Sequence, residues 1–506
     1  MTSERKRIIS NYVRLFVTFF AGILIVRLIA EIAVSALVLY LLIFASSGFA
    51  QAFKIIVQES AVPALGLSYN HIDGKKFGGI YWFSFVLSFA ASLCALLVYG
   101  VFWALRGYMD FGGLPTNLYL IALIAAALRT VVSSLANPSL NAILVSGRVV
   151  TYNVVLVCER LSDLVGILIV HLLLSGLDAV DQIIWFYGMS TLLYVLTQLT
   201  CYLAAVKIDK RFCLRPAALP VKERQWVKGL FGWNVVIVVA FLLYLRLSTF
   251  LLNISYGEES TLIVGIVFLL IGYQRQISMG LVVGLDAVAS RLNVSSHRGD
   301  AQMRELILRS TYIQAVFSLG SMVFMILFVE QIFNLWFGDS LLESGWNVEQ
   351  AGTIFRVMAI GVLARSLSEA WMKLLGGRGM VGSYAGYLIL AAVVNALVVF
   401  GIVNFGGYSV YVTMVIIAIS FSIFYVLVHL FVVPLQVERY LGVKFRDLIY
   451  ALLMPVQVML IAGVIGWGVV SQLDLAYDMF ITTVFLIAIG LWLVVRGAKY
   501  STESVR

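Results

Sequence analysis

The chain alternates long apolar runs with short polar segments from one end to the other. Each run is roughly the 17–25 residues that an α-helix needs to cross a bilayer, or somewhat longer, as a tilted helix requires. The pattern therefore predicts an all-α polytopic membrane protein with about fourteen transmembrane helices. The predicted spans lie near residues 11–29, 33–54, 80–105, 117–146, 152–175, 181–206, 230–253, 261–284, 306–333, 351–375, 384–404, 408–433, 447–471 and 476–495.

One polar break stands out near the middle of the chain. The stretch from Lys207 to Lys228 holds seven Lys/Arg, two acidic residues and two of the seven prolines. Such a cluster cannot lie in hydrocarbon, and its basic character places it in the cytoplasm by the positive-inside rule. We expect a basic linker at 207–229 between a six-helix bundle at 1–206 and a second at 230–433. Two extra helices and a tail follow at 434–506.

The charges of the remaining loops alternate in sign along the chain. The loops that the fourteen spans place on the side of the linker are basic, and the loops on the other side are acidic apart from Arg106. This alternation predicts that both termini are cytoplasmic. The acidic residues assigned to the outer loops are Asp110, Asp178, Asp181, Glu258, Glu259, Asp339, Glu343, Glu349, Asp474 and Asp478.

A weak internal repeat relates the two predicted bundles. Gly147, after span four, recurs as Gly377 after span ten at an offset of 230, and Asn11 recurs as Asn234 at an offset of 223. A third landmark, in the loop after span two, recurs after span eight at an offset of 226. Six is an even number of spans, so the two halves insert in the same direction. Pseudo-symmetry about an axis along the membrane normal is expected.

Composition narrows the class of protein further. Hydrophobic residues make up 62% of the 506 and charged residues only 12%, and the net charge of +9 is accounted for by the basic loops rather than by nucleic-acid binding. The four cysteines are scattered without metal-ligand spacing, so neither disulfides nor zinc are expected. No P-loop, GxSxG or HExxH motif is present, which favours a transporter over an enzyme and predicts no cofactor.

Charged residues inside the predicted spans are the candidate functional groups. A central Arg or Asp costs about 2.5–3.5 kcal/mol on insertion scales, so these side chains should face a hydrated cavity or pair with one another. Residues near span ends, such as Arg14, Arg27, Lys54 and Arg356, can instead snorkel to the interface. The more central charges are Arg129, Glu159, Arg160, Asp163, Arg246, Arg275, Arg365 and Glu369.

Arginine is the candidate substrate-binding residue. Arg129, Arg246 and Arg275 have no acidic residue within four positions on their own spans, which favours a lumen-facing position. Arg365 lies four residues before Glu369 and forms either a structural ion pair or part of a binding site. Guanidinium groups offer a planar fork that matches phosphate oxygens. The predicted substrate-binding set is Arg129, Arg246, Arg275, Arg365 and Arg160.

Two carboxylates share one face of span five. Glu159 and Asp163 are four residues apart, and a buried acid is a suitable carrier of a coupling proton or cation. We predict that Asp163 and Glu159 couple transport to a proton or sodium gradient.

The sequence resembles a known family in three places. These are the opening IISNYVRLFVTFF…VRLI, the VPALGLSYN…DGKKF after span two, and the SGRVVTYN after span four. Together with the two bundles, the basic linker and the two added helices, they resemble the bacterial polysaccharide transporters. That family of O-antigen and exopolysaccharide repeat-unit flippases belongs to the multidrug/oligosaccharidyl-lipid/polysaccharide exporter superfamily.

The resemblance implies a V-shaped pair of bundles around a central cavity in the bacterial inner membrane. It implies a substrate made of an undecaprenyl-pyrophosphate-linked oligosaccharide, moved to the outer leaflet by alternating access for O-antigen, capsule or exopolysaccharide assembly. A polysaccharide polymerase and a chain-length regulator would be partners. The alternatives are a cation-coupled multidrug exporter, a lipid II flippase, and a polysaccharide polymerase or ligase. The polymerase or ligase is disfavoured by the absence of a sizeable outer loop among the predicted loops.

Overall fold

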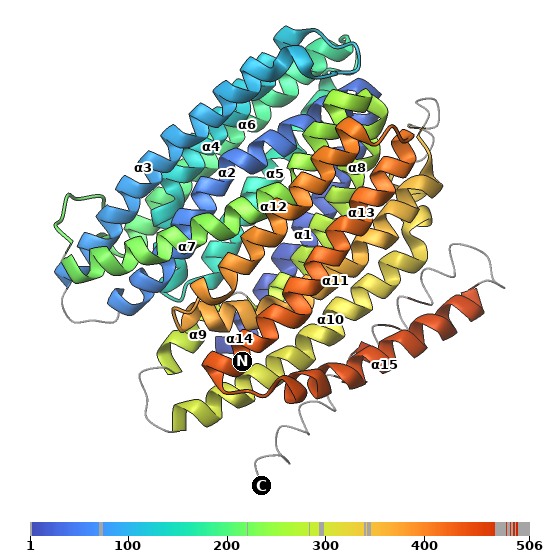
Figure 1. Ribbon diagram of the computed structural model, residues 1–506. Coiled ribbons are helices and arrows are strands. Elements are labelled where there is room, and N and C mark those ends of the chain that lie inside the picture. Colours follow the sequence, from blue (N-terminus) through green and yellow to red (C-terminus); the bar gives the residue numbers. More distant parts are fainter. Residues whose placement is uncertain are drawn as a thin grey trace. The chain divides into compact units, whose positions relative to one another are not determined.

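Every regular element of the described chain is a helix (Figure 1). The computed structural model describes residues 3–69, 74–219, 221–282, 284–292, 298–337, 341, 346–470, 482, 486, 489–490 and 492–493. Most of the predicted last span, 476–495, lies outside these residues. Part of the third landmark of the internal repeat, at 70–73 and 293–297, lies outside them as well.

Long helices follow one another in chain order, with short helices at their junctions. The α-helices are α1 (Ser3–Ile32), α2 (Val34–Tyr69), α3 (Gly74–Ala104), α4 (Thr116–Val145), α5 (Val149–Leu173), α6 (Ala179–Ile208), α7 (Val221–Leu245), α8 (Leu247–Val282), α9 (Leu285–Leu292), α10 (Arg298–Phe337), α11 (Val348–Gly377), α12 (Gly382–Phe405), α13 (Val410–Val426), α14 (Val433–Leu441) and α15 (Phe445–Val470). The 3₁₀ helices η1 (Leu105–Tyr108) and η2 (Lys210–Phe212) and the π-helix η4 (Leu427–Val432) complete them.

Eleven helical stretches of the described chain are long and apolar enough to cross a membrane. The prediction of a multi-pass, all-helical membrane protein is therefore confirmed, while the number fourteen and the orientation of the termini stay predictions. α5 is not among the eleven, because Glu159, Arg160 and Asp163 interrupt its apolar run. One of the eleven, Phe231–Gly280, is broken at Gly257, whose φ of +74° places it in the left-handed region. The sequence placed a turn between two spans at that point.

The chain forms two compact units. Unit 1 comprises Met1–Ile266, Trp336–Trp346 and Val399–Val410, and unit 2 comprises Val267–Leu335, Asn347–Val398 and Tyr411–Arg506. Within unit 1, α4 packs against α2, α3 and α6, and α5 packs against α1 and α6; α3, α4 and α6 run side by side in Figure 1. Within unit 2, α11 packs against α9, η4 and α14.

Unit 1 also contains α7 and the first part of α8, which the sequence assigned to the second bundle. α7 packs along α2, where Val238 joins a buried apolar cluster with Ala52 and Ile56. Asn234 donates a hydrogen bond to the Ser60 hydroxyl at 3.1 Å in the same contact. The bundle boundaries at 206 and 230 stay a prediction.

The beginning of the basic linker is folded onto unit 1. Phe212, in η2, is fully buried in a cluster of aromatic and apolar side chains from α2, α3 and α6 that includes Phe77 and Tyr81. The Phe212 ring lies 5.6 Å from the Phe77 ring and 6.2 Å from the Tyr81 ring, between centroids. This aromatic packing fixes the point at which the chain leaves α6.

Candidate functional site

The candidate charges of unit 1 form a cluster inside the helix bundle. Arg129, on α4, contacts Asp163, on α5, with 2.6 Å between Nη1 and Oδ1. Its guanidinium also lies over the Tyr194 ring of α6, 4.6 Å from the centroid. Arg160 reaches the other oxygen of Asp163 at 3.5 Å. Two guanidinium groups therefore share one carboxylate.

Glu159 lies one helical turn away from Asp163. Its Oε1 accepts a hydrogen bond of 2.7 Å from Nε2 of Gln198 on α6. Thus Glu159 has an amide partner while Asp163 has two arginine partners. Sequence reasoning placed both acids on one face of α5, but it identified neither Gln198 nor Tyr194, because these residues are more than thirty positions away.

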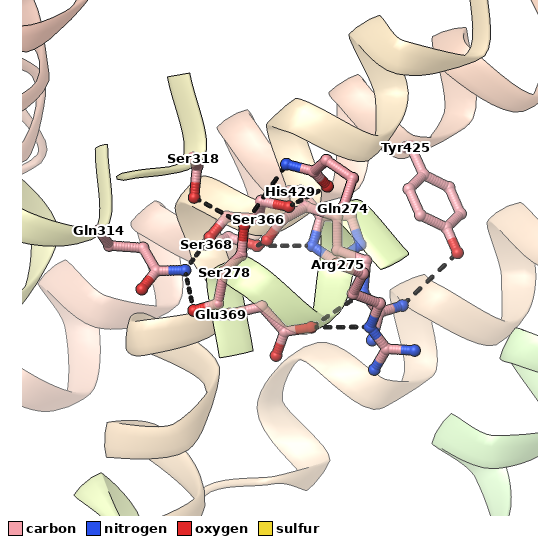
Figure 2. Close-up of polar contacts among 11 residues, drawn as sticks. Gln274, Arg275, Ser278, Gln314, Ser318, Ser366, Ser368, Glu369, Tyr425 and His429 are labelled. Atoms are coloured by element: carbon pink, nitrogen blue, oxygen red, sulfur yellow. Dashed lines mark hydrogen bonds and ion pairs between the residues drawn. The ribbon is translucent and has the colours of Figure 1, made fainter. Parts of the chain in front are cut away.

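Unit 2 contains a second cluster, centred on Glu369 (Figure 2). Glu369 Oε1 accepts from Nε of Arg365 at 3.0 Å and from Nε of Arg275 at 3.4 Å. Arg365 also contacts the Tyr425 hydroxyl, 3.5 Å from its Nη1. The i, i+4 pair expected on α11 is present, and α8 adds a second guanidinium to it.

A network of neutral polar side chains continues from this cluster through the interior of unit 2 (Figure 2). Gln314 Nε2 donates to the backbone carbonyl oxygens of Ser278 and Ser366, each at 2.9 Å. Ser278 and Ser318 share a hydrogen bond of 2.9 Å. All four side chains are fully buried. Their sequence signal was weak, because single Ser and Gln residues in an apolar run also occur as ordinary helix-packing residues.

His429 belongs to the same interior. It lies in the π-helix η4, is fully buried, and its Nδ1 is 2.7 Å from the Ser368 hydroxyl. This buried contact with a serine of α11 is typical of a histidine that packs between helices. π-helical turns are often found at functional sites.

Arg246 lies at the junction of α7 and α8 in unit 1. Its guanidinium is 4.2 Å from the centroid of the Phe44 ring of α2. Gly48, one turn further along α2, leaves the space for it, because a Cβ built on Gly48 would lie 2.6 Å from Nε of Arg246. The arginine is therefore seated in a notch on α2.

Exposure separates the candidate arginines. The side chains of Arg129, Arg160 and Arg275 are 21%, 22% and 29% exposed, whereas that of Arg365 is 4% exposed. The first three side chains are therefore partly accessible, whereas that of Arg365 is enclosed. Arg365 is positioned to hold Glu369 and Tyr425.

Charges near the span ends have partners as well. Arg356 pairs with Glu330 at 2.8 Å, and its Nε donates to the Ile326 carbonyl, which the break of α10 at Phe328 leaves near the end of a helical segment. Arg27 pairs with Glu31 at 3.0 Å. Ion pairing, rather than snorkelling alone, accounts for these two arginines.

Metal-ligand groups are not found in the described chain. No set of three or more His, Cys, Asp or Glu residues there is arranged to hold a metal ion. The four cysteines are free thiols. The roles predicted for the seven candidate site residues toward a substrate or an ion stay predictions.

Comparison with known proteins identifies structures with a similar fold but no sequence relatives. No protein-family model matches the chain, and no curated protein sequence matches it. Among solved structures, an outward-facing multidrug resistance MATE transporter of the MOP superfamily has a TM-score of 0.65, with 12% identity over 87% of this chain and 97% of that one. The chain has the MOP transporter fold.

Two other MOP-fold structures extend the comparison. The lipid II flippase MurJ, in an inward closed conformation, has a TM-score of 0.61 with 11% identity and covers 98% of this chain and 99% of its own. A MOP superfamily transporter from Pyrococcus furiosus, described as having a binding pocket of reverse polarity, has a TM-score of 0.62 with 12% identity, covering 87% of this chain and 97% of that one. At this level of identity the three structures show the fold that the chain shares with them, and the superfamily expected from the sequence stays a prediction.

Proposed function

We propose that the chain is a flippase. Its substrate would be an oligosaccharide repeat unit linked through pyrophosphate to undecaprenol, which it moves across the bacterial inner membrane by alternating access. The observation that supports this proposal most directly is that the partly exposed side chains of Arg129, Arg160 and Arg275 lie on long helices of the two units, each beside a carboxylate. A pyrophosphate group is the anionic part of such a substrate, and a guanidinium group matches it geometrically.

The ion pairs suggest what the arginines contact when the transporter is without substrate and when substrate is bound. With no substrate, Asp163 and Glu369 keep the guanidinium groups neutralised, which lowers the cost of holding them on membrane helices. A phosphate oxygen that approaches Arg129 or Arg275 competes with the carboxylate for the same N–H donors. Binding then exchanges one anion for another, and release restores the original pair.

The extent of structural similarity also supports a flippase. Superposition on the lipid II flippase covers 98% of this chain, whereas superposition on the outward-facing MATE transporter covers 87%. A cationic drug is also a poor ligand for exposed arginines, because like charges repel. The multidrug exporter is therefore the weaker alternative.

The test is complementation of a host that lacks its own repeat-unit flippase. Arg129, Arg246 and Arg275 are replaced singly by Ala and by Lys, with Arg106→Ala in a predicted outer loop as the control. We expect the three Ala variants to reach the membrane, to lose surface polysaccharide, and to accumulate lipid-linked intermediates on the cytoplasmic face. Full display by all three would refute substrate binding by these arginines.

A lipid II flippase is the second candidate, because of the MurJ similarity. Rescue of cells depleted of their lipid II flippase, with no rescue of repeat-unit export, would favour this candidate over the first. In either case Asp163 and Glu159 are the proposed coupling residues for a proton or sodium gradient. A polysaccharide polymerase and a chain-length regulator are the proposed partners.

A further inference from the structure

Two asparagines on α4 have polar atoms without a hydrogen-bond partner in the described part of the chain. These atoms are Oδ1 of Asn137 and both Oδ1 and Nδ2 of Asn141, and the two side chains are 1% and 0% exposed. Asn137 uses only its Nδ2, which donates to the Lys54 carbonyl of α2 at 3.3 Å. Buried amides inside a membrane protein are normally satisfied by protein or by ordered water.

The asparagines continue a polar stripe along α4. Arg129, which contacts Asp163, begins it, and Ser133, which is buried and donates a hydrogen bond to the Thr130 carbonyl, follows four residues later. Asn137 and Asn141 follow at the same interval. Residues four apart on a helix are neighbours, with about 5–6 Å between their Cβ atoms. That separation suits a water molecule hydrogen-bonded to both amides.

The register with α5 places this pair beyond Glu159. α4 and α5 are joined by a short turn and run antiparallel, and the Arg129–Asp163 contact fixes their alignment. Counting from that contact, the two asparagines lie level with residues 151–155 of α5. Glu159 and its partner Gln198 lie about one turn away, toward Arg129.

The other side of the pair lies near the end of the helix. α4 ends at Val145, one turn after Asn141. Tyr152, at the same level on α5, interacts electrostatically with Arg14 of α1 and Gln58 of α2. Arg14 and Gln58 are half-buried rather than buried, so the polar interior reaches partly exposed side chains here.

We propose that Asn137 and Asn141 line a hydrated pocket inside unit 1. Its ligand is a short file of water molecules that bridges the two amides and connects Glu159 with the aqueous phase at the end of α4. Water fits better than a metal cation, because Nδ2 of Asn141 is a donor and requires an acceptor.

The pocket would give water or protons access to Glu159, the candidate coupling acid, from one side. Glu159 is held by the side-chain amide of Gln198, and the water file reaches it from the side opposite to Asp163. The proposal concerns hydration of the bundle alone and does not depend on which substrate is transported. Its test therefore needs no transport assay.

Thiol accessibility is the direct test. The full chain, with its four native cysteines replaced, is purified into nanodiscs as Asn137→Cys, Asn141→Cys or Ser139→Cys and treated with 2-aminoethyl methanethiosulfonate. Ser139 is the matched control, because it is 2% exposed on the same helix but hydrogen-bonds the Tyr81 hydroxyl in the aromatic cluster. We expect the asparagine-site thiols to react at least about tenfold faster than the control, since modification requires water at the thiol. Equally slow reaction at all three sites would overturn the proposal.

A second measurement leaves the native cysteines in place. Asn141→Leu is compared with wild type by thermal unfolding, and Asn117→Leu, at an exposed position near the start of α4, gives the general effect of the substitution. In a hydrated pocket, leucine displaces the bridging water and leaves Oδ1 of Asn137 without a hydrogen bond, so the Tm falls relative to the control. In a dry pocket, leucine replaces an unpaired amide of similar size and the Tm rises, which contradicts the proposal.

Discussion

Arg129 and Asp163 show why single residues in this protein cannot be interpreted alone. Their contact joins α4 to α5 at 2.6 Å, and Arg160 approaches the same carboxylate. Removing one member of a buried ion pair leaves an uncompensated charge, which costs more than the pair contributes. A loss of transport after mutation of either residue is therefore ambiguous between chemistry and structure.

A double-mutant cycle resolves that ambiguity. Asp163→Asn should destabilise the protein by an amount between the roughly 1 kcal/mol of an exposed pair and the about 3–5 kcal/mol of a fully buried one. Adding Arg129→Gln should recover part of that loss, measured as Tm in detergent. The coupling role is tested by transport: if Asp163→Asn transports with unchanged pH and ion dependence, Asp163 only positions Arg129.

Gly48 gives a second prediction at the scale of one residue. Gly48→Ala places a methyl group 2.6 Å from Nε of Arg246 and should force the guanidinium away from Phe44. The arginine side chain is flexible and can move aside, so the cost is the loss of its contact with the Phe44 ring, about 0.5–2 kcal/mol, which offsets the up to ~1 kcal/mol that Ala gains over Gly in a helix. Gly100→Ala on α3 is the control, because no atom lies within 4 Å of its added Cβ. A Tm for Gly48→Ala equal to or above that of Gly100→Ala would contradict the notch.

At the scale of the element, the linker begins with a small structured motif. Asp209 accepts hydrogen bonds from the backbone N–H of Arg211 at 2.9 Å and from its Nη2 at 2.7 Å. Arg211 lies over the Tyr69 ring of α2 at 4.7 Å, next to the buried Phe212. The hydrogen bond from the Arg211 side chain holds the pKa of Asp209 below its ordinary value. The ionised carboxylate therefore stabilises the folded linker start.

The pH dependence of that stabilisation can be measured. Because the folded-state pKa is depressed, the contribution is complete above the unfolded value of about 3.9 and is lost as the pH falls through the folded-state pKa. Asp209→Asn should lower stability by about 0.5–1.5 kcal/mol at pH 7, and by the same amount down to about pH 5. The difference should shrink only in stronger acid, and exposed Lys210→Gln serves as the control. A Tm equal to wild type at pH 7 would show that the contact contributes nothing.

At the scale of the whole molecule, orientation in the membrane depends on one feature. The basic linker orients all of the spans if it is cytoplasmic. Fusions of truncated chains to reporter proteins test this orientation. A fluorescent protein fused after Ala217 should fluoresce, because it folds in the cytoplasm. Alkaline phosphatase fused after Gly176 should be active, because it works on the opposite side of the membrane. The reverse pattern would invert the predicted topology. Arg106 is the one clearly basic residue in the predicted outer loops, and it does not change the predicted orientation.

Sequence alone determined the helical class, most of the membrane-spanning segments and the turn at Gly257. The physical reason is that hydrocarbon forces the backbone to satisfy its own hydrogen bonds, so apolar length and polar breaks are sufficient evidence. It also identified Arg129, Asp163, Arg275 and Glu369 as residues of interest, because charge inside a span is costly wherever it lies.

Only the tertiary structure showed which charged and polar residues contact one another. Arg129 and Arg275 had no acidic partner on their own spans, yet each contacts a carboxylate on another helix, 34 and 94 positions away in sequence respectively. The isolated amide of Asn141 and the neutral network around Gln314 were equally invisible. The rotation and register of one helix against another determine these contacts, and the periodicity of a single apolar helix contains no record of its neighbours.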